Sequence, residues 1–192
     1  MKKLLCFLGG AMSIITVFAQ KNKPIKTLFI ESRLPEITFH NVICYPDSVA
    51  TLSDFQENKT KLVIFDFWFT HCSSCIAQFP KLDSLQNTFD NNIQIVMVAH
   101  EPEAVIKAFI DKWERKHHSK FKLPIITGDT ILHKLIRHFS ESHYAWVTPD
   151  NVLVAQTASY FINKEVLGAY LQLMPAEIAN RGFLRNSPLN KK

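Results

Sequence analysis

The sequence predicts an α/β protein in which a mixed central sheet of about four or five strands carries helices on both faces. Apolar, β-favouring runs alternate along the chain with segments whose apolar residues recur at helical spacing. A hairpin and one further helix close the chain, which adds antiparallel strands to an otherwise parallel arrangement. The length of 192 residues fits one domain and is short for two.

The amino terminus has the composition of a cleaved signal peptide. Two lysines precede an apolar run that reaches Phe18, and compact residues come before Gln20. We therefore expect a signal peptide over residues 1–19, export to the periplasm or another extracytoplasmic space, and a loosely held lead-in over 20–33. The apolar run is short for a membrane span, but an uncleaved membrane anchor stays open as the alternative.

The folded domain is expected over residues 34–174, and its first element is a strand near Ile37 to Val42. Cys44 follows this strand, and we interpret it as a buried small apolar residue, with a disulfide between two copies of the chain as the alternative. A turn at 46–48 and a short helical element at 52–55 then lead to the next strand.

The central strand is predicted over residues 62–69, where an almost unbroken β-favouring run suits a strand covered on both faces. Asp66 is its one charged residue, and a carboxylate inside such a strand is costly unless it is paired or neutralised. Cys72 and Cys75 follow and open a segment, 76–89, whose apolar residues have helical spacing. Cys72 is therefore expected at a helix amino terminus.

This placement predicts different roles for the two cysteines. Free backbone N–H groups and the helix dipole favour a thiolate, so Cys72 is the candidate nucleophile. Cys75 lies one turn further along and can close a disulfide with Cys72 after that attack. Asp66 is the candidate base that takes the proton from Cys75. A structural ion pair between Asp66 and Lys61 stays open as the alternative.

The next segments repeat the alternation of strand and helix. Residues 92–98 predict a second, parallel strand, and the helix after it begins at Pro102 and ends within 116–120. The His pair in that last stretch is expected at a solvated helix end. A short strand at 123–126 precedes a helix that Asp129 can cap.

The remaining elements are a short helix, a hairpin and a final helix. The helix after Asp129 is expected to bury apolar residues as far as Phe139, with His133 and His138 on its exposed side. A hairpin joins 144–147 to 152–156.

The chain is expected to close with a helix and a tail. Asn163 can cap a final helix whose inner face reaches Met174. Residues 175–192 are expected to form a basic carboxyl-terminal tail.

Several short motifs resemble those of thioredoxins. They are Asp66-Phe67-Trp68, Cys72-x-x-Cys75 and Pro80, together with Leu52-Ser53-Asp54-Phe55 upstream and Trp146-Val147-Thr148-Pro149-Asp150-Asn151 downstream. Over roughly residues 34–174 the chain is similar to TlpA/ResA-like extracytoplasmic thioredoxins. The resemblance implies a thioredoxin-like fold and an active-site helix that Pro80 kinks. It also implies a thiol-disulfide oxidoreductase that uses a redox-active Cys72/Cys75 pair.

The same resemblance implies the partners of the reaction. Disulfide-bearing proteins are the expected substrates, reduction is the expected direction, and a membrane-embedded thiol donor is the expected source of electrons. Trp68, His71, Ser142 and His143 are the expected substrate-binding residues. His71 either stabilises the Cys72 thiolate when protonated or only covers the turn.

Ser142 departs from the family, whose members have a cis-proline at this place. A cis bond before a non-proline residue costs roughly 2.5 to 4 kcal/mol, so we predict a trans Glu141–Ser142 bond. The substrate groove should then be altered, with narrower or weaker handling of generic disulfides that Ser142→Pro would improve.

Charge and ligand patterns limit the other functions. The formal net charge of +5 falls to +3 without residues 1–19. Four basic residues after Asn180 account for this remaining positive charge, so no nucleic-acid partner is expected. The main rival is a copper- or zinc-binding module built on Cys72 and Cys75 with His71, His143 or Cys44. A degenerate adaptor is the second rival. We expect a monomeric enzyme without metal or other cofactor.

Overall fold

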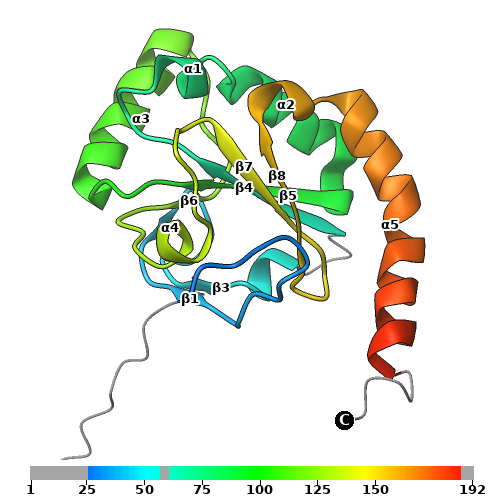
Figure 1. Ribbon diagram of the computed structural model, residues 1–192. Coiled ribbons are helices and arrows are strands. Elements are labelled where there is room, and N and C mark those ends of the chain that lie inside the picture. The colour runs from blue at the N-terminus through cyan, green and yellow to red at the C-terminus, as the bar shows by residue number, and fades with distance from the viewer. Residues whose placement is uncertain (1–25, 57–60, 187–192) are drawn as a thin grey trace, which may run out of the picture.

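The computed structural model describes residues 26–56 and 61–186, and the predicted signal peptide lies outside this range. The larger sheet is mixed and has the order β2-β6-β5-β4-β7-β8 (Figure 1). Its strands are β2 Val42–Ile43, β4 Leu62–Phe67, β5 Ile93–Val98, β6 Ile125–Ile126, β7 His143–Val147 and β8 Leu153–Ala158. A smaller antiparallel sheet pairs β1 Thr38–Phe39 with β3 Ala50–Thr51.

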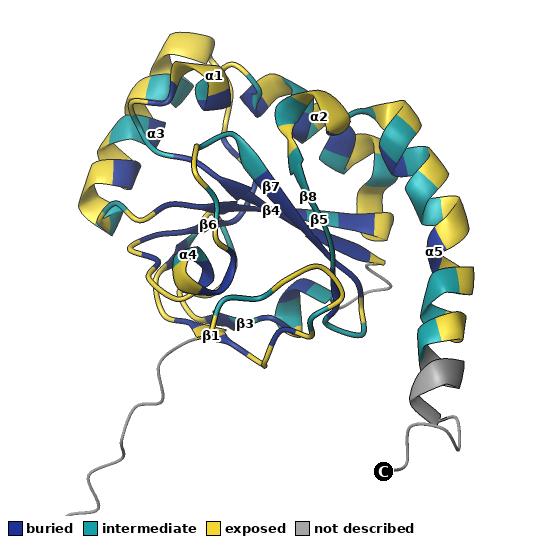
Figure 2. Cartoon of the chain, viewed as in Figure 1, coloured by how far each residue is buried: buried dark blue, intermediate teal, exposed yellow. Residues whose placement is uncertain are grey.

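Helices cover both faces of the larger sheet, as predicted (Figure 2). The α-helices are α1 Ser73–Ile76, α2 Phe79–Phe89, α3 Glu103–His117, α4 Leu132–Leu135 and α5 Lys164–Asn186. Short 3-10 turns are η1 Asp54–Gln56, η2 Asp90–Asn92 and η3 Ser159–Phe161. Helices α1, α2, α3 and α5 contribute to the core on one face, whereas α4, η1 and the smaller sheet contribute to the core on the other.

β4 is buried along its whole length because nearly all its side chains are apolar. It runs parallel to β5 and antiparallel to β7, as the order of strand, helix and hairpin predicts. Since side chains alternate along a strand, Leu62 and Ile64 belong to the core under α2 and α3. Phe65 and Phe67 belong to the core under α4. The carboxyl end of β4 therefore supports two separate layers.

The amino-terminal part of the domain differs from the prediction. The expected strand near Ile37 to Val42 is divided, because β1 pairs with β3 while β2 pairs with β6 in the larger sheet. This division supplies the sixth strand. Cys44 follows β2 with a φ of 55° and an exposed side chain, so its interpretation as a buried apolar residue is wrong.

Pro80 divides the active-site helix instead of kinking it. α1 ends at Ile76, and α2 begins two residues after Ala77 with Pro80 in its first turn. A proline there costs no hydrogen bond, because the first N–H groups of a helix have no intrahelical acceptor. The two helices consequently meet at a break directly after the cysteine turn.

α4 is shorter than the sequence pattern predicts. Asp129 does cap it, since its carboxylate oxygens accept hydrogen bonds from the backbone N–H groups of Ile131, Leu132 and His133. The helix ends at Leu135, however, and the chain continues in extended backbone. Phe139 is therefore 93% exposed, and its predicted burial is wrong.

The carboxyl-terminal helix is longer than expected. Asn163 caps α5 through a 2.9 Å hydrogen bond from the Val166 N–H, as predicted. α5 then continues through Pro175, so the first part of the expected basic tail is helical. Arg181 lies 3.2 Å from the Asp150 carboxylate and holds this extension against the hairpin turn. Among the described helices, none combines the length and apolarity that a bilayer span requires.

Candidate active site

Cys72 and Cys75 form a disulfide at the start of α1. Cys72 is the N-cap residue of this helix, as predicted, and its backbone N–H donates to the Phe69 carbonyl at 3.0 Å. Only 8% of Cys72 is exposed, but Cys75 is completely buried. Cys72 is therefore the sulfur that an incoming thiol can reach.

Two polar groups point at the Cys72 sulfur. The backbone N–H of Cys75 donates to Sγ at 3.2 Å, and the Ser74 hydroxyl lies 3.4 Å from the same atom. Both can donate to a thiolate when the disulfide opens, and hydrogen bonds to the charged form favour it. The local geometry thus supports charge on Cys72, not on Cys75.

Asp66 is fully buried in β4, on the face that also holds the cysteines. Neither of its carboxylate oxygens has a hydrogen-bond partner in the described part of the chain. Burial raises the pKa of Asp66 well above its ordinary value, the nearby Tyr144 hydroxyl opposes this increase, and Glu141 adds to it. Lys61 is exposed, and no ion pair with Asp66 is present among the described residues. The alternative interpretation of Asp66, a structural ion pair with Lys61, is therefore wrong.

Tyr144 is a buried neighbour of Asp66 that could not be recognised from the sequence. It lies directly opposite Asp66 in the antiparallel pairing of β4 with β7. Its hydroxyl is buried without a hydrogen-bond partner in the described chain, and burial followed by the Asp66 charge raises its pKa. The only sequence signal for this residue is the register between the two strands, which the sequence does not specify.

The structure places the four expected substrate-binding residues differently. Trp68 is completely buried, with its ring centroid 5.1 Å from Phe79 and 5.6 Å from Phe109. It therefore supports the cysteine turn from behind and offers no surface to a substrate. His71, in contrast, is exposed and lines a hollow beside the cysteine turn.

Ser142 and His143 lie where the loop before β7 meets the end of β4. The Glu141–Ser142 bond is trans, as predicted, and Ser142 adopts a left-handed φ of 63°. Its N–H donates to the Phe67 carbonyl at 3.2 Å. His143 points to the α4 side, where Nε2 lies 2.9 Å from the Gln156 side-chain oxygen and burial lowers the pKa of its ring.

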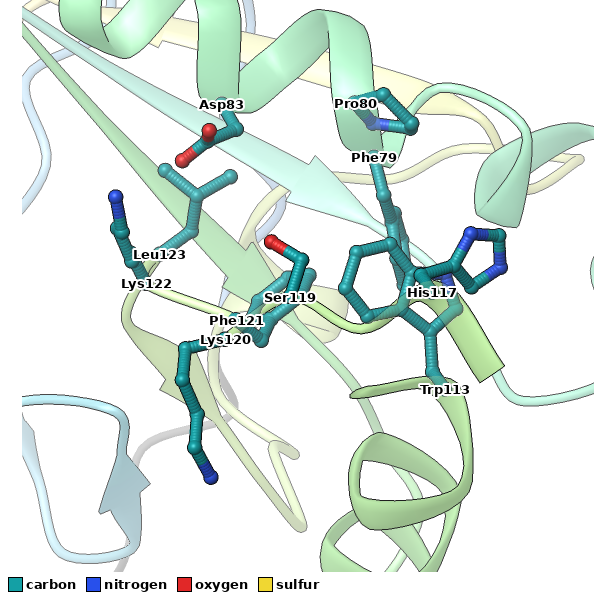
Figure 3. A pocket seen from close by; sticks show the side chains of 10 residues that line it. All are labelled: Phe79, Pro80, Asp83, Trp113, His117, Ser119, Lys120, Phe121, Lys122 and Leu123. Carbon is teal, nitrogen blue, oxygen red and sulfur yellow. The ribbon is translucent and has the colours of Figure 1, made fainter. Parts of the chain in front are cut away.

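Two of the hollows that border α3 share Trp113 and His117. The one beside the cysteine turn, about 530 Å³, is lined by Thr70, His71, Ile76, Val105, Phe109, Lys112, Trp113, Lys116 and His117. The second, about 260 Å³, lies further from the disulfide between the start of α2 and the chain after α3 (Figure 3). The Trp113 and His117 rings, stacked 4.5 Å apart, contribute to both.

A cluster of histidines surrounds Phe67 on the opposite face of β4. The ring of Phe67 lies 5.0 Å from His133, 4.4 Å from His138 and 6.0 Å from His143. The expected exposed position of His138 is wrong, because only 7% of its side chain is accessible. The side chain of His133 is likewise only 19% accessible.

The metal site considered from the sequence is not assembled in the oxidised form that the structure describes. Cys72 and Cys75 are bonded to each other, and Cys44 is a free, exposed cysteine. The one group of candidate metal ligands in residues 26–56 and 61–186 consists of His100, His133 and Glu141.

The AhpC/TSA family model matches residues 31–166. Thioredoxin-like protein YneN of Bacillus subtilis is 30% identical over 66 residues, which are 32% of this chain and 39% of that protein. Thiol-disulfide oxidoreductase ResA of Halalkalibacterium halodurans is 29% identical over 62 residues, or 31% of this chain and 35% of that protein. The matches thus span little more than a third of these curated relatives.

Solved structures share the fold at low identity. The thioredoxin domain of thiol-disulfide oxidoreductase BVU-2223 from Bacteroides vulgatus aligns with a TM-score of 0.54 and 23% identity, covering 76% of this chain and 97% of that one. Enterococcus faecalis AhpC aligns with a TM-score of 0.58 and 16% identity, covering 79% and 94%. These likenesses confirm the predicted thioredoxin-like fold.

Proposed function

The chain belongs to the AhpC/TSA family and has a thioredoxin-like fold, and from this premise we propose that it is an extracytoplasmic thiol-disulfide oxidoreductase. Cys72 and Cys75 form its redox pair, and reduction of disulfides in substrate proteins is its reaction. The difference in accessibility between the two sulfurs carries this proposal, since only Cys72 reaches the surface.

In the first step, the Cys72 thiolate attacks one sulfur of the substrate disulfide. The substrate S–S bond breaks, a mixed disulfide with Cys72 forms, and the released substrate thiolate takes up a proton. The Cys75 N–H and the Ser74 hydroxyl, at 3.2 and 3.4 Å, stabilise the attacking thiolate.

In the second step, Cys75 loses its proton to the Asp66 carboxylate and attacks the Cys72 sulfur. The second substrate thiol leaves, and the Cys72–Cys75 disulfide forms as the substrate gains two electrons. Burial of Asp66 raises its pKa toward that of a thiol, which suits a base for this transfer. A membrane-embedded thiol donor then reduces the disulfide again.

The hollow beside the cysteine turn is the proposed substrate groove. Ile76, Val105 and Phe109 give it an apolar lining, and Lys112 and Lys116 add positive charge. His71 stands at its edge and is exposed, so it is the expected residue for direct contact with the substrate. Ser142 and His143 are not among the residues that line this hollow, and His143 points to the α4 side of β4.

The test is trapping of the mixed disulfide. Cys75→Ser should accumulate a covalent complex with a disulfide-bearing protein such as insulin, whereas Cys72→Ser should not, and both should lose turnover to the uncatalysed level. Mass spectrometry of the complex identifies the cysteine involved. Faster alkylation of Cys75 than of Cys72 in the reduced protein would overturn the assignment of roles.

The rivals give different results in the same preparation. An adaptor would bind partner proteins and leave insulin disulfides unreduced. A metal module built on the cysteines would release copper or zinc from the reduced protein, and its metal content would fall to background in the double variant Cys72→Ser/Cys75→Ser.

A further inference from the structure

Two buried polar atoms on the α4 side of β4 lack hydrogen-bond partners. Nε2 of His133 and Oε2 of Glu141 are both inaccessible to solvent, and neither forms a hydrogen bond within the described chain. Buried polar side-chain atoms almost always have such a partner in folded proteins. A nitrogen lone pair and a carboxylate oxygen left in this way can be satisfied by a bound cation.

These two residues belong to a group of three possible metal ligands. His100, His133 and Glu141 each provide one ligand atom, and these atoms all lie within 4.8 Å of one another. They come from three segments: the chain just after β5, α4, and the loop before β7. The tertiary fold, not a local sequence motif, therefore assembles the group.

Asp129 fixes the orientation of His133. Its Oδ2 lies 2.7 Å from Nδ1 of His133, and its oxygens also accept three backbone N–H groups at the start of α4. Because the ionised carboxylate only accepts, Nδ1 carries a proton, and in the neutral imidazole this leaves Nε2 with its lone pair. A carboxylate holding the far nitrogen of a histidine in this way is typical of metal ligands.

His138 forms an ion pair with Glu141 but does not provide a hydrogen-bond partner for His133. Its Nε2 lies 3.7 Å from Glu141 Oε2, which is an ion-pair distance and longer than a hydrogen bond. His133 Nε2 remains without a partner in the described structure. Histidine–glutamate pairing alone thus leaves the cluster unsatisfied.

We propose that His100, His133 and Glu141 bind a divalent transition-metal ion of the Zn²⁺ class. Two imidazoles and one carboxylate suit zinc and its neighbours better than Mg²⁺ or Ca²⁺, which take oxygen ligands. This site goes beyond the proposed redox function and uses neither cysteine. His100 is exposed, so an ion can enter from solvent and keep water in its remaining position.

The distances require a small adjustment on binding. Zinc bonds of about 2.0–2.2 Å place tetrahedral ligand atoms roughly 3.3 Å apart. A separation at the 4.8 Å limit would therefore have to close by roughly 1.5 Å, and a shorter one by less. Rotation of the exposed His100 side chain can supply this change, while Asp129 and the packing of His133 against Phe67 hold the second ligand in place.

Calorimetric titration of the tag-free, oxidised protein with Zn²⁺ tests the proposal, because the closed disulfide removes the cysteine thiolates. One ion should bind per chain, and His100→Ala, His133→Gln and Glu141→Gln should each weaken binding at least 10-fold. Since His100 is exposed, His100→Ala should fold normally, which circular dichroism can verify. Absence of binding at millimolar Zn²⁺, or unchanged affinity in the three variants, would overturn the site.

His71→Ala is the matched control, since His71 is also exposed but borders the cysteine turn. Its affinity for Zn²⁺, and that of Cys72→Ser/Cys75→Ser, should equal that of the unmodified protein, and loss of binding in either would assign the ion to the cysteines. Bound Co²⁺ should accordingly lack thiolate charge-transfer absorption. Insulin reduction by the metal-free protein tests the redox function separately.

Discussion

The two buried aspartates on either side of β4, Asp66 and Asp129, are held in opposite ways. On the cysteine face, Asp66 and the Tyr144 hydroxyl are buried without hydrogen-bond partners among the described residues. On the histidine face, Asp129 and His143 are each held by hydrogen bonds, to His133 and Gln156 respectively. Polar groups that remain unpaired cost stability and point to chemistry, whereas paired groups stabilise the fold. The comparison therefore predicts opposite effects of substituting Asp66 and Asp129.

Asp66→Asn should give the largest effect, in the second chemical step. Loss of a positioned base slows proton transfer by about 10²-fold or more, so resolution of the mixed disulfide should slow while the initial attack by Cys72 stays unchanged. Rapid-quench kinetics with a disulfide peptide separates the two steps. Equal resolution rates for both proteins across neutral pH would mean that Asp66 is not the base.

The same substitution should raise stability at neutral pH. Because burial raises the pKa of Asp66, the folded protein favours the protonated acid. The carboxyl group therefore contributes stability below its unfolded pKa of about 3.9 and loses it as the pH rises toward the folded value. Asp66→Asn should be stabilised at pH 7 by about 1–3 kcal/mol, with little difference near pH 3. Denaturant unfolding at both pH values measures this.

Asp129→Ala should have the opposite sign, on the histidine face. It removes the cap of α4 and the hydrogen bond to His133, so stability should fall by about 2 kcal/mol. The pKa of Asp129 is lowered because the bonds from His133 and from backbone N–H groups outweigh burial. The wild-type advantage should thus be present above pH 4 and disappear in acid. An unchanged melting temperature at pH 7 would contradict the comparison.

Ser142 lies at the end of β4, between the two faces, and its substitution should change the stability of this loop. A left-handed φ costs a residue with a Cβ roughly 1–2 kcal/mol, so Ser142→Gly should stabilise the protein by about 1 kcal/mol. Proline cannot adopt the φ of 63° and would lose the N–H bond to the Phe67 carbonyl. Ser142→Pro should therefore destabilise this loop, whereas the sequence alone predicted that it would improve the handling of generic disulfides. Thermal unfolding of both variants gives the comparison.

Tyr144→Phe should give the smallest effect. Removing a buried hydroxyl without a partner is close to neutral, or stabilising by less than about 1 kcal/mol. The hydroxyl opposes the increase in the Asp66 pKa, so its loss should raise that pKa further and shift the resolution step to higher pH. The pH profile of the resolution rate detects this shift, and a shift to lower pH would contradict it.

The sequence was sufficient to predict the arrangement of the cysteine face because its residues are adjacent in the chain. β4, Asp66 and the Cys72/Cys75 turn occupy one continuous stretch, and hydrophobic periodicity predicts both the strand and the helix that follows. The predictions that Asn163 and Asp129 cap helices are likewise correct, because capping depends on residues adjacent in the sequence. Tyr144 could not be predicted, since its position opposite Asp66 depends on strand register.

The histidine face could not be predicted for a different reason. Helical periodicity extends from Ile131 to Phe139, but the helix ends at Leu135. That early end turns His138 into the protein and exposes Phe139. The cluster also needs His100, from the end of a strand far away in sequence. Local sequence patterns cannot show that His100, His133 and Glu141 come close together in the fold.

Consecutive residues of one strand support the two faces, Asp66 on one side and Phe67 on the other. Since side chains in a strand alternate with a period of two, a one-residue insertion or deletion within β4 would exchange the carboxylate and the phenyl ring between layers. Point substitutions, in contrast, can remove either function alone. Divergent descendants of this chain can therefore lose the cysteine chemistry or the histidine cluster separately, but the length of β4 has to be inherited unchanged if either is to survive.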